Sequence, residues 1–303
     1  MSCCSLFAVL LRLGDLGMTR VGLVQAIRPL RRLRGGSQPL LVEASDGHLY
    51  VIKMLGNPQG PNILFNEALG TEIFRSAGLL VPEWRAVVLS DDFIDGHREI
   101  WFETENGPCR QSAGCCFGSR LLGSGVHSLL EILPRGSFAR IRNRRDLWMA
   151  WVLDVLCEHT DNRQAIFIED ETRYLDAYFI DHGNLFGGAH GTMTPIIQGC
   201  RYLDPRVYDD VKRGCARQIF EAIRCIDTNT LLAVAADLPA SWTTETAMGR
   251  LRRFCERIGH PALLRDTIRL ILGAGKPVQS ISGKDAETGW GVRPTLAVNA
   301  RPR

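Results

Sequence analysis

The hydrophobic pattern of this 303-residue chain changes once, near residue 126. Before that point, residues 20–125 carry short apolar runs separated by turn residues, which predicts a β-rich lobe. From residue 126 to residue 275, apolar residues recur at helical spacing, which predicts a mostly α-helical lobe. The sequence therefore predicts an α+β protein of two lobes, with a ligand site in the cleft between them.

Individual elements can be placed on this outline. In the first lobe we expect strands over 40–42, 49–53, 87–89, 99–102 and 115–122 and a helix over 63–79. In the second lobe we expect helices over 146–157, 205–225, 228–237, 243–258 and 261–273, and strands over 165–168 and 174–180.

Two terminal segments are expected to lie outside the lobes. Residues 276–303 are rich in Gly, Ser, Pro and Arg without periodicity, which predicts a flexible tail. Residues 1–19 form an N-terminal extension, in which Arg12 interrupts an apolar run too short for a signal sequence or a membrane span. We therefore expect a cytoplasmic protein without a membrane partner, and Met1 and Met18 are both candidate starts.

The overall composition excludes several classes of protein. With 45% hydrophobic and 23% charged residues, the chain is neither disordered nor fibrous. Its net charge of +3 gives no support to a nucleic-acid partner. The 10 cysteines include no Cys-x-x-Cys pair, so free thiols in a reducing compartment are favoured over zinc or disulfides.

Lys53 ends the second strand of a predicted hairpin whose turn contains Asp46 and Gly47. It is the only lysine in the first 211 residues, although the chain has 36 Lys and Arg residues. An ammonium group makes a point contact with phosphate that a guanidinium fork does not replace. The alternative is a strand-end lysine whose ammonium reaches solvent.

Two neighbouring segments fit a phosphate site around Lys53. Gly35, Gly36 and Ser37 precede the hairpin, and glycines allow backbone N–H groups to approach phosphate oxygens closely. Glu67 lies near the start of the predicted helix, where its carboxylate can pair with Lys53. Each has a simpler alternative, an ordinary turn for the glycines and an interaction with the helix dipole for Glu67.

The most specific segment is HTDNRQ at 159–164, followed by the predicted hairpin of 165–180 and by Asp181. A hairpin returns its two ends to one place, so Asp161 and Asp181 are expected to converge. Two carboxylates beside a cleft suit one general base and one metal ligand. The alternative is a pair of loop aspartates that cap local backbone.

The order of these segments resembles the protein-kinase-like fold, and their variant resembles the HipA-like kinases of bacteria. The resemblance covers residues 20–225 and rests on the segments 35–39, 46–53, 66–67, 78–82, 159–167 and 180–183. It implies an ATP-dependent phosphotransferase, most simply a serine/threonine protein kinase, that acts on a hydroxyl acceptor. The acceptor, protein or small molecule, is not identified by the sequence, nor is any antitoxin-type partner.

The resemblance also implies a role for each matching residue. Lys53, paired with Glu67, would contact the phosphates of ATP beneath Gly35, Gly36 and Ser37. Asp161 would be the catalytic aspartate, and Asp181 would bind Mg²⁺. The strand segment 116–119, which includes Phe117, would line the adenine edge as a hinge.

One position departs from the kinase pattern. Five residues after the catalytic aspartate, where kinases carry a metal-binding Asn, this chain has Ile166. Asn162 or Gln164 could supply the missing amide oxygen. Otherwise the chain would be a pseudokinase that binds a nucleotide or a partner without catalysis.

A third alternative is a nucleic-acid-binding module. It is motivated by two clusters of arginines, which are Arg28, Arg31, Arg32 and Arg34, and Arg135, Arg140, Arg142, Arg144 and Arg145. These clusters lack interleaved aromatic residues, so they are more typical of solvated faces.

Overall fold

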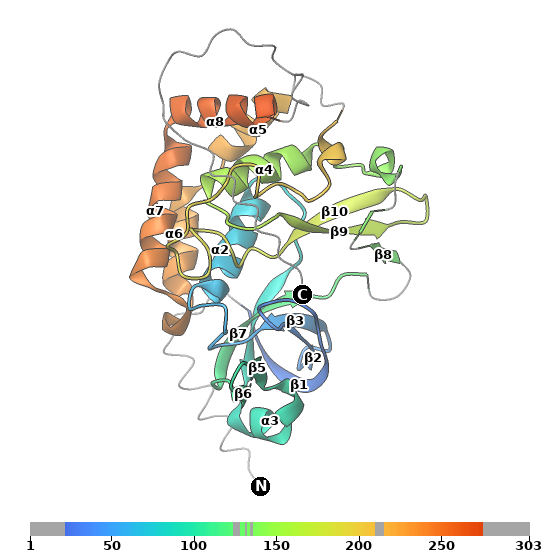
Figure 1. Cartoon of the computed structure of the whole chain (residues 1–303), viewed down its shortest axis with the longest axis vertical. Helices are drawn as coiled ribbons and strands as arrows, with labels where there is room; N and C mark the ends of the chain where they lie inside the picture. The colour runs from blue at the N-terminus through green and yellow to red at the C-terminus, as the bar shows by residue number, and fades with distance from the viewer. Residues whose placement is uncertain (1–21, 124–127, 131, 134–135, 210–214, 275–303) are drawn as a thin grey trace, which may run out of the picture.

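The first part of the chain forms a closed five-stranded β-barrel (Figure 1). The computed structural model describes residues 22–274 except 124–127, 131, 134–135 and 210–214. The predicted extension of residues 1–19, the tail of 276–303, Met1 and Met18 therefore lie outside the described residues, as does the predicted lobe boundary at 125/126.

The strand order in the barrel is β1-β2-β3-β7-β4. Its strands are β1 (Leu23–Arg32), β2 (Leu40–Ala44), β3 (Leu49–Lys53), β4 (Trp84–Leu89) and β7 (Gly114–Arg120). Four of the pairings are antiparallel, and the parallel pairing of β1 with β4 closes the barrel. The predicted hairpin of β2 and β3 is confirmed, and Gly47 adopts φ +78° in its turn.

An insert between β4 and β7 differs from the prediction. It contains α3 (Asp91–Gly96), the 3₁₀ helix η1 (Arg98–Ile100) and the hairpin of β5 (Phe102–Thr104) and β6 (Gly107–Cys109). The predicted strand over 99–102 is therefore wrong. The indole of Trp101 donates to the carbonyl of Ile94 at 3.2 Å, and this contact folds the segment back onto α3.

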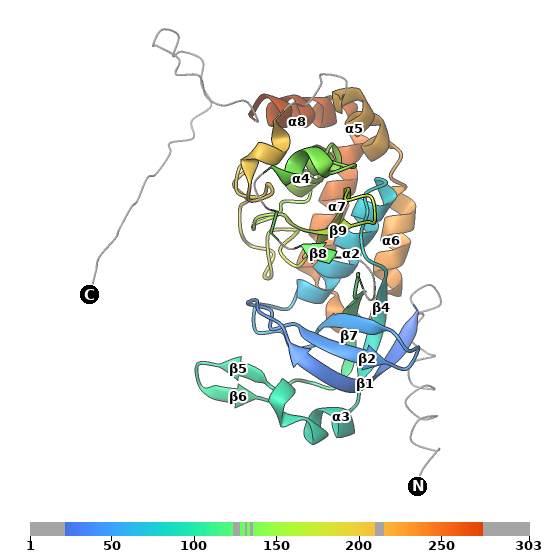
Figure 2. The ribbon, with the colours of Figure 1, turned by 90° about the vertical axis from the view of Figure 1, so that its right-hand side faces the viewer.

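Helix α2 (Ile63–Ser76) is buried along most of its length because it packs against both β7 and the helices of the second part. It ends at Ser76, three residues before the predicted end at residue 79, and Gly78 adopts φ +82° just beyond it. Figure 2 shows α2 on the side of the barrel that faces the helices, and the hairpin of β5 and β6 at the other end of the molecule.

The second part of the chain is mostly helical, as predicted. It contains η2 (Ser137–Arg140), α4 (Asp146–Leu156), η3 (Pro205–Tyr208), α5 (Cys215–Arg224), α6 (Thr228–Asp237), η4 (Ala240–Trp242), α7 (Glu245–Gly259) and α8 (Pro261–Ala274). The predicted helix over 205–225 is wrong as one element. Its first turn is the 3₁₀ helix η3, which Asp204 caps and which ends in extended backbone at Asp209, and α5 is described from Cys215.

The predicted hairpin after Asp161 is present as β9 (Gln164–Glu169) and β10 (Leu175–Ile180). Its register pairs Gln164 with Ile180, next to Asp181. A third strand, β8 (Ser128–Leu130), pairs with β9 and was not predicted. Within the described parts of the chain, the cysteines are all free thiols, and none of the helices is long and apolar enough to cross a membrane.

Candidate functional site

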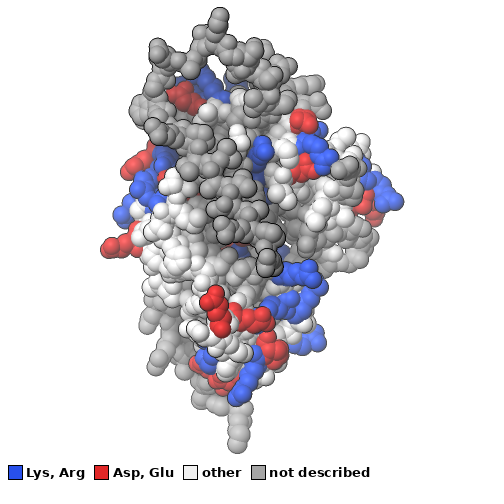
Figure 3. Space-filling view, in the orientation of Figure 1, with Lys and Arg blue, Asp and Glu red and all other residues white. Residues whose placement is uncertain are grey.

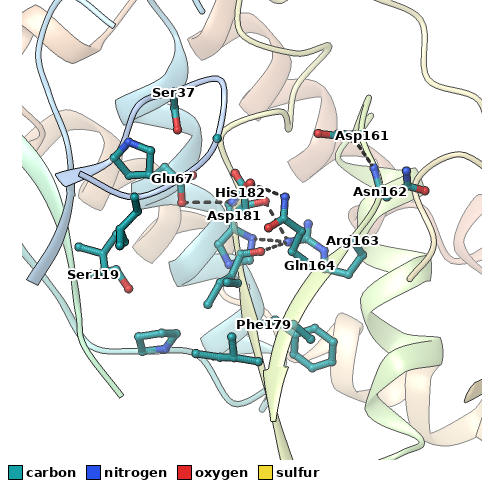
Figure 4. A pocket seen from close by; sticks show the side chains of 18 of the residues that line it. Ser37, Glu67, Ser119, Asp161, Asn162, Arg163, Gln164, Phe179, Asp181 and His182 are labelled. Carbon is teal, nitrogen blue, oxygen red and sulfur yellow. Dashed lines mark hydrogen bonds between the residues drawn. The ribbon is translucent and has the colours of Figure 1, made fainter. Parts of the chain in front are cut away.

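A cavity of about 1320 Å³ lies between the barrel and the helical part. Its walls come from the β1–β2 loop, from β3 and β7 of the barrel and from α2. The start of β9 and the end of β10, which lie together at the open end of their hairpin, also line it. This volume exceeds that of a typical small-molecule site. Every residue to which the sequence assigned a site role lies on its wall. Figure 4 shows a pocket with several of these side chains.

The β1–β2 loop forms one side of the cavity and carries Gly35, Gly36 and Ser37. Gly35 adopts φ +140°, and a Cβ atom on Gly36 would lie 2.5 Å from the amide nitrogen of Gln59. The backbone conformation of Gly35 therefore favours glycine, whereas at Gly36 the flexible side chain of Gln59 could move aside. The side chain of Asn57 donates to the carbonyl of Ser37 at 2.9 Å, which fixes the loop from below.

Gln38, the next residue, ties this loop to the β5–β6 hairpin. Its side-chain Nε2 donates to the carbonyl of Glu103 at 2.6 Å, and its Oε1 accepts from the backbone N–H of Glu103 at 2.8 Å. The amide of Gln38 thus pairs with the backbone of Glu103 as a neighbouring strand would. Sequence reasoning assigned no role to this residue.

Lys53 binds two carboxylates at the centre of the cavity. Its ammonium donates to Glu67 Oε1 of α2 and to Asp181 Oδ1 at 2.7 Å. The second carboxylate oxygen of Glu67 accepts from the backbone N–H of His182 at 3.1 Å. The predicted pairing of Lys53 with Glu67 is present, and the lysine does not reach solvent, because it is only 8% exposed.

The charges of this cluster support one another. Burial alone would lower the pKa of Lys53, but the carboxylates of Glu67 and Asp181 outweigh it and raise that pKa above its ordinary value. Burial alone would raise the pKa of Asp181, but the charge and hydrogen bond of Lys53 lower it to about 2. At neutral pH the cluster therefore holds an ammonium and an ionised aspartate on the cavity wall.

Asp161 lies on the same cavity but contacts a different set of groups. Its Oδ1 accepts from the backbone N–H of Asn162 at 2.7 Å, and its Oδ2 accepts from the side chain of Asn184 at 3.3 Å. In Figure 4, Asp161 and Asn162 lie apart from Asp181. The hairpin thus brings both aspartates to one cavity, and only Asp181 contacts Lys53.

Gln164 is the amide that lies beside Asp181. Its Nε2 donates to Asp181 Oδ2 at 2.7 Å, because the hairpin register places Gln164 opposite Ile180. Ile166 pairs with Tyr178, one pleat repeat farther from Asp181. Asn162 lines the cavity, and its backbone N–H donates to the carboxylate of Asp161. Gln164 is therefore better placed than Asn162 to act beside Asp181.

The described residues contain no group of three or more His, Cys, Asp and Glu side chains that could hold a metal ion. A cation bound here would take Asp181 and Gln164 as protein ligands and fill its shell from a ligand and water. Mg²⁺ is commonly held in this way, by one or two protein oxygens together with phosphates.

Comparison with known proteins gives one informative likeness. No protein-family model matches the sequence, and no curated protein matches it. Among solved structures, the Helicobacter pylori proinflammatory kinase CtkA superposes with a TM-score of 0.51 at 12% identity, over 81% of this chain and 95% of that one. A Golgi casein kinase gives a TM-score of 0.46 at 11% identity, over 87% of this chain and 76% of that one.

The chain has a protein-kinase-like fold. At 12% identity this likeness extends to the fold and leaves the HipA-like resemblance a prediction. Within this fold, the barrel, α2 and the β9–β10 hairpin surround one cavity, as the order of the sequence segments predicted.

Phe117 lies on the cavity wall next to Lys53. It pairs with Lys53 across β3 and β7, is 3% exposed, and stacks on Trp84 with ring centroids 5.5 Å apart. The strand continues to Arg120, and the backbone N–H of Leu121 bonds to the carbonyl of Leu49. The role of Phe117 at the adenine edge stays a prediction.

The arginine clusters are largely occupied by partners within the protein. Arg28 pairs with Glu43, Arg140 with Glu169, and Arg142 with Asp170 and Asp176. Arg144 donates to three backbone carbonyls at 206–209, and Arg135 lies outside the described residues. Figure 3 shows positive and negative side chains interspersed over much of the visible face. The clusters thus give little support to a nucleic-acid-binding module.

Several residues of the site had no predicted role. They are Arg163 and Asp154, which form a buried ion pair, Asn184, which contacts Asp161, and Asn66, whose side chain donates to the carbonyls of Gly183 and Leu185 at 2.7 and 2.8 Å. Arg163 and Asn66 lie inside the segments that carried the prediction. A polar residue flanked by apolar ones was an available signal for Asp154, which stands between Leu153 and Val155.

Proposed function

We propose that this chain is an ATP-dependent phosphotransferase with a two-lobed, HipA-like kinase architecture. It transfers the γ-phosphate of Mg-ATP to a hydroxyl acceptor, most simply a serine or threonine of a protein. The observation that carries the proposal is the contact of Lys53 with both Glu67 and Asp181 on the wall of the cavity, opposite a glycine-containing loop.

The nucleotide would lie with its phosphates between Lys53 and the loop of Gly35, Gly36 and Ser37. The ammonium of Lys53 would contact phosphate oxygens, and backbone N–H groups of the loop would donate to others. Glu67 would hold Lys53 in place from α2. Since the cavity is larger than most small-molecule sites, it leaves room for an acceptor beside the nucleotide.

Mg²⁺ would be held by Asp181 and Gln164, whose oxygens are hard ligands that suit this cation. When bound, it would neutralise charge on the phosphates as the transferred group moves. Asp181 is ready for this role because its low pKa keeps it ionised at neutral pH.

Asp161 would hold the acceptor hydroxyl and accept its proton. The acceptor oxygen forms a bond to the γ-phosphorus, the bond from that phosphorus to the bridging oxygen breaks, and ADP leaves with the electron pair. The hydrogen bond from Asn184 would orient the Asp161 carboxylate toward the acceptor.

The direct test is incubation of the full chain with γ-labelled ATP and Mg²⁺, in the presence of a lysate as the source of acceptors. We expect label on the chain itself or on an acceptor, and loss of that label in the Asp181→Asn variant. Equal labelling by wild type and Asp181→Asn would contradict the proposal.

A second candidate function is that of a pseudokinase, and Ile166 at the position of the usual metal-binding Asn favours it. Such a protein would bind nucleotide without transfer. It would show a nucleotide-dependent rise in melting temperature with no labelled product from any acceptor.

A further inference from the structure

Arg163 is a buried cation next to the loop that carries Asp181. It is 1% exposed, and its guanidinium carbon lies 4.7 Å from the ring centroid of Phe74. It lies on the cavity wall between Asn162 and Gln164, and none of the roles proposed above uses it. A cation buried to this degree must be compensated by its neighbours.

The guanidinium binds two different parts of the fold. On one side it pairs with Asp154 of α4, through Nε to Oδ2 at 2.9 Å and through Nη2 to Oδ1. On the other side its Nη1 donates to the backbone carbonyls of Ile180 at 2.8 Å and of Asp181 at 3.2 Å. A planar fork with several donors can make both sets of bonds at once, and a single ammonium cannot.

The carbonyls that Arg163 binds belong to a strained turn. Asp181 adopts φ +59°, in the left-handed region that an aspartate occupies at a cost. Without a donor at this place, two carbonyl groups of the turn would lose a hydrogen bond inside the protein. The adjacent ring of His182 is held by the same Nη1 atom, which lies 3.2 Å from its Nδ1.

We infer that Arg163, anchored by Asp154, is the positioning residue that keeps Asp181 in its left-handed conformation, with its carboxylate on the cavity wall. Arg163 holds the peptide group before Asp181 through the carbonyl of Ile180. The peptide group after Asp181 is held by Arg163 through the carbonyl of Asp181 and by Glu67 through the N–H of His182. The consequence for metal binding rests on the proposed function, whereas the conformational inference does not.

Two variants separate positioning from simple packing. Arg163→Lys keeps a positive charge beside Asp154 but has one ammonium for two groups of partners. The double variant Arg163→Met with Asp154→Leu removes both buried charges together, so that neither is left unpaired. Arg142→Lys is the matched control, because Arg142 is an exposed arginine that pairs with aspartates at the opposite end of the same hairpin.

Hydrogen–deuterium exchange of the full chain tests the conformational inference. We expect exchange in the peptide spanning residues 180–184 to become about tenfold faster in both Arg163 variants, as for the loss of one or two hydrogen bonds. Peptides of the barrel and of α7 should keep their wild-type rates, and Arg142→Lys should change none of them. Unchanged exchange at 180–184, or equally faster exchange throughout the chain, would overturn the inference.

The affinity for ADP, measured with Mg²⁺ and with EDTA, tests the consequence for the site. In Arg163→Lys we expect the gain in affinity that Mg²⁺ gives to the wild type to be lost, while the affinity in EDTA stays unchanged. An intact gain from Mg²⁺ would overturn this consequence. If the wild type binds no ADP in either condition, the proposed function fails, and the exchange experiment still decides the role of Arg163.

Discussion

The ammonium of Lys53 lies 2.7 Å from the carboxylate of Asp181, although the two residues are separated by 128 positions in the chain. One comes from a barrel strand and the other from the loop after β10, so the contact joins the two parts of the fold across the cavity. Glu67 binds Lys53 from α2 and the backbone of His182 from that loop. This contact places the charges of the site on one wall, and the predictions below follow from it.

Replacement of Lys53 by Met should destabilise the fold. Glu67 would lose its partner inside the protein, and breaking a buried ion pair typically costs about 3–5 kcal/mol. Burial raises the pKa of Glu67, so in this variant its carboxylate is expected to take up a proton. The double variant Lys53→Met with Glu67→Gln should recover part of the loss in urea unfolding. A Lys53→Met variant as stable as wild type would contradict this account of the pair.

Gln164→Ala should weaken the response to Mg²⁺. The variant removes the amide that lies 2.7 Å from Asp181, so the Mg²⁺ concentration needed for half-maximal phosphotransfer should rise about tenfold, by analogy with the loss of other groups that orient metal ligands. Ile166→Ala is the matched control, because Ile166 lies on the same face of β9 but pairs with Tyr178. An equal rise of this Mg²⁺ concentration in both variants would show that Gln164 has no specific role in Mg²⁺ binding.

Gln38→Ala should loosen the glycine-containing loop without unfolding the barrel. The two hydrogen bonds between the Gln38 amide and the Glu103 backbone would be lost. The Kd for ATP should therefore rise, while the melting temperature should stay near that of wild type. Glu103→Ala removes an exposed side chain and keeps the backbone bonds, so its Kd should match that of wild type. The same Kd in Gln38→Ala and Glu103→Ala would show that the side chain of Gln38 does not hold this loop in place.

The stability of the protein should fall as pH decreases below about 6.5, in part through His182. Burial, and then the charge of Arg163, hold the pKa of His182 well below its ordinary value, so the folded state keeps the ring neutral. The unfolded state takes up the proton near pH 6.5, which costs the folded state about 1.4 kcal/mol per pH unit below that value.

The variant His182→Gln provides the comparison. Burial raises the pKa of Asp154 to about 6, which opposes the trend, but this residue is common to both proteins and cancels in their difference. Urea unfolding at pH 7.5 and 5.5 should show a smaller loss of stability in His182→Gln than in wild type. Parallel losses would mean that His182 is protonated in the folded protein.

Much of the site could be predicted because its residues lie at the ends of short, regular strands. Lys53 ends a strand of the Asp-Gly hairpin, and Asp161 and Asp181 flank a second hairpin. In each case the period-two pattern and the turn residues fix where the strand stops. The order of these segments then indicated the fold, which the structural likeness to a kinase supports.

The remainder depended on contacts that local pattern does not encode. The parallel pairing of β1 with β4 joins distant segments, and the stacking of Phe117 on Trp84 is a tertiary contact that the strand pattern does not indicate. Arg163 lies in the HTDNRQ segment, but arginine side chains are normally exposed. Its burial against Asp154 depends on the packing of α4, which the local sequence does not indicate.

Calorimetric titration of Mg-ATP into the wild type and into Lys53→Ala tests the central claim most directly. The account predicts saturable binding of one nucleotide by the wild type, and affinity reduced about 10–10²-fold in Lys53→Ala, the scale expected for the loss of a hydrogen bond between charged groups. Arg28→Ala, which removes an exposed ion pair on the barrel, should bind as wild type does. Wild-type affinity in Lys53→Ala, or no binding by the wild type at millimolar Mg-ATP, would contradict the account.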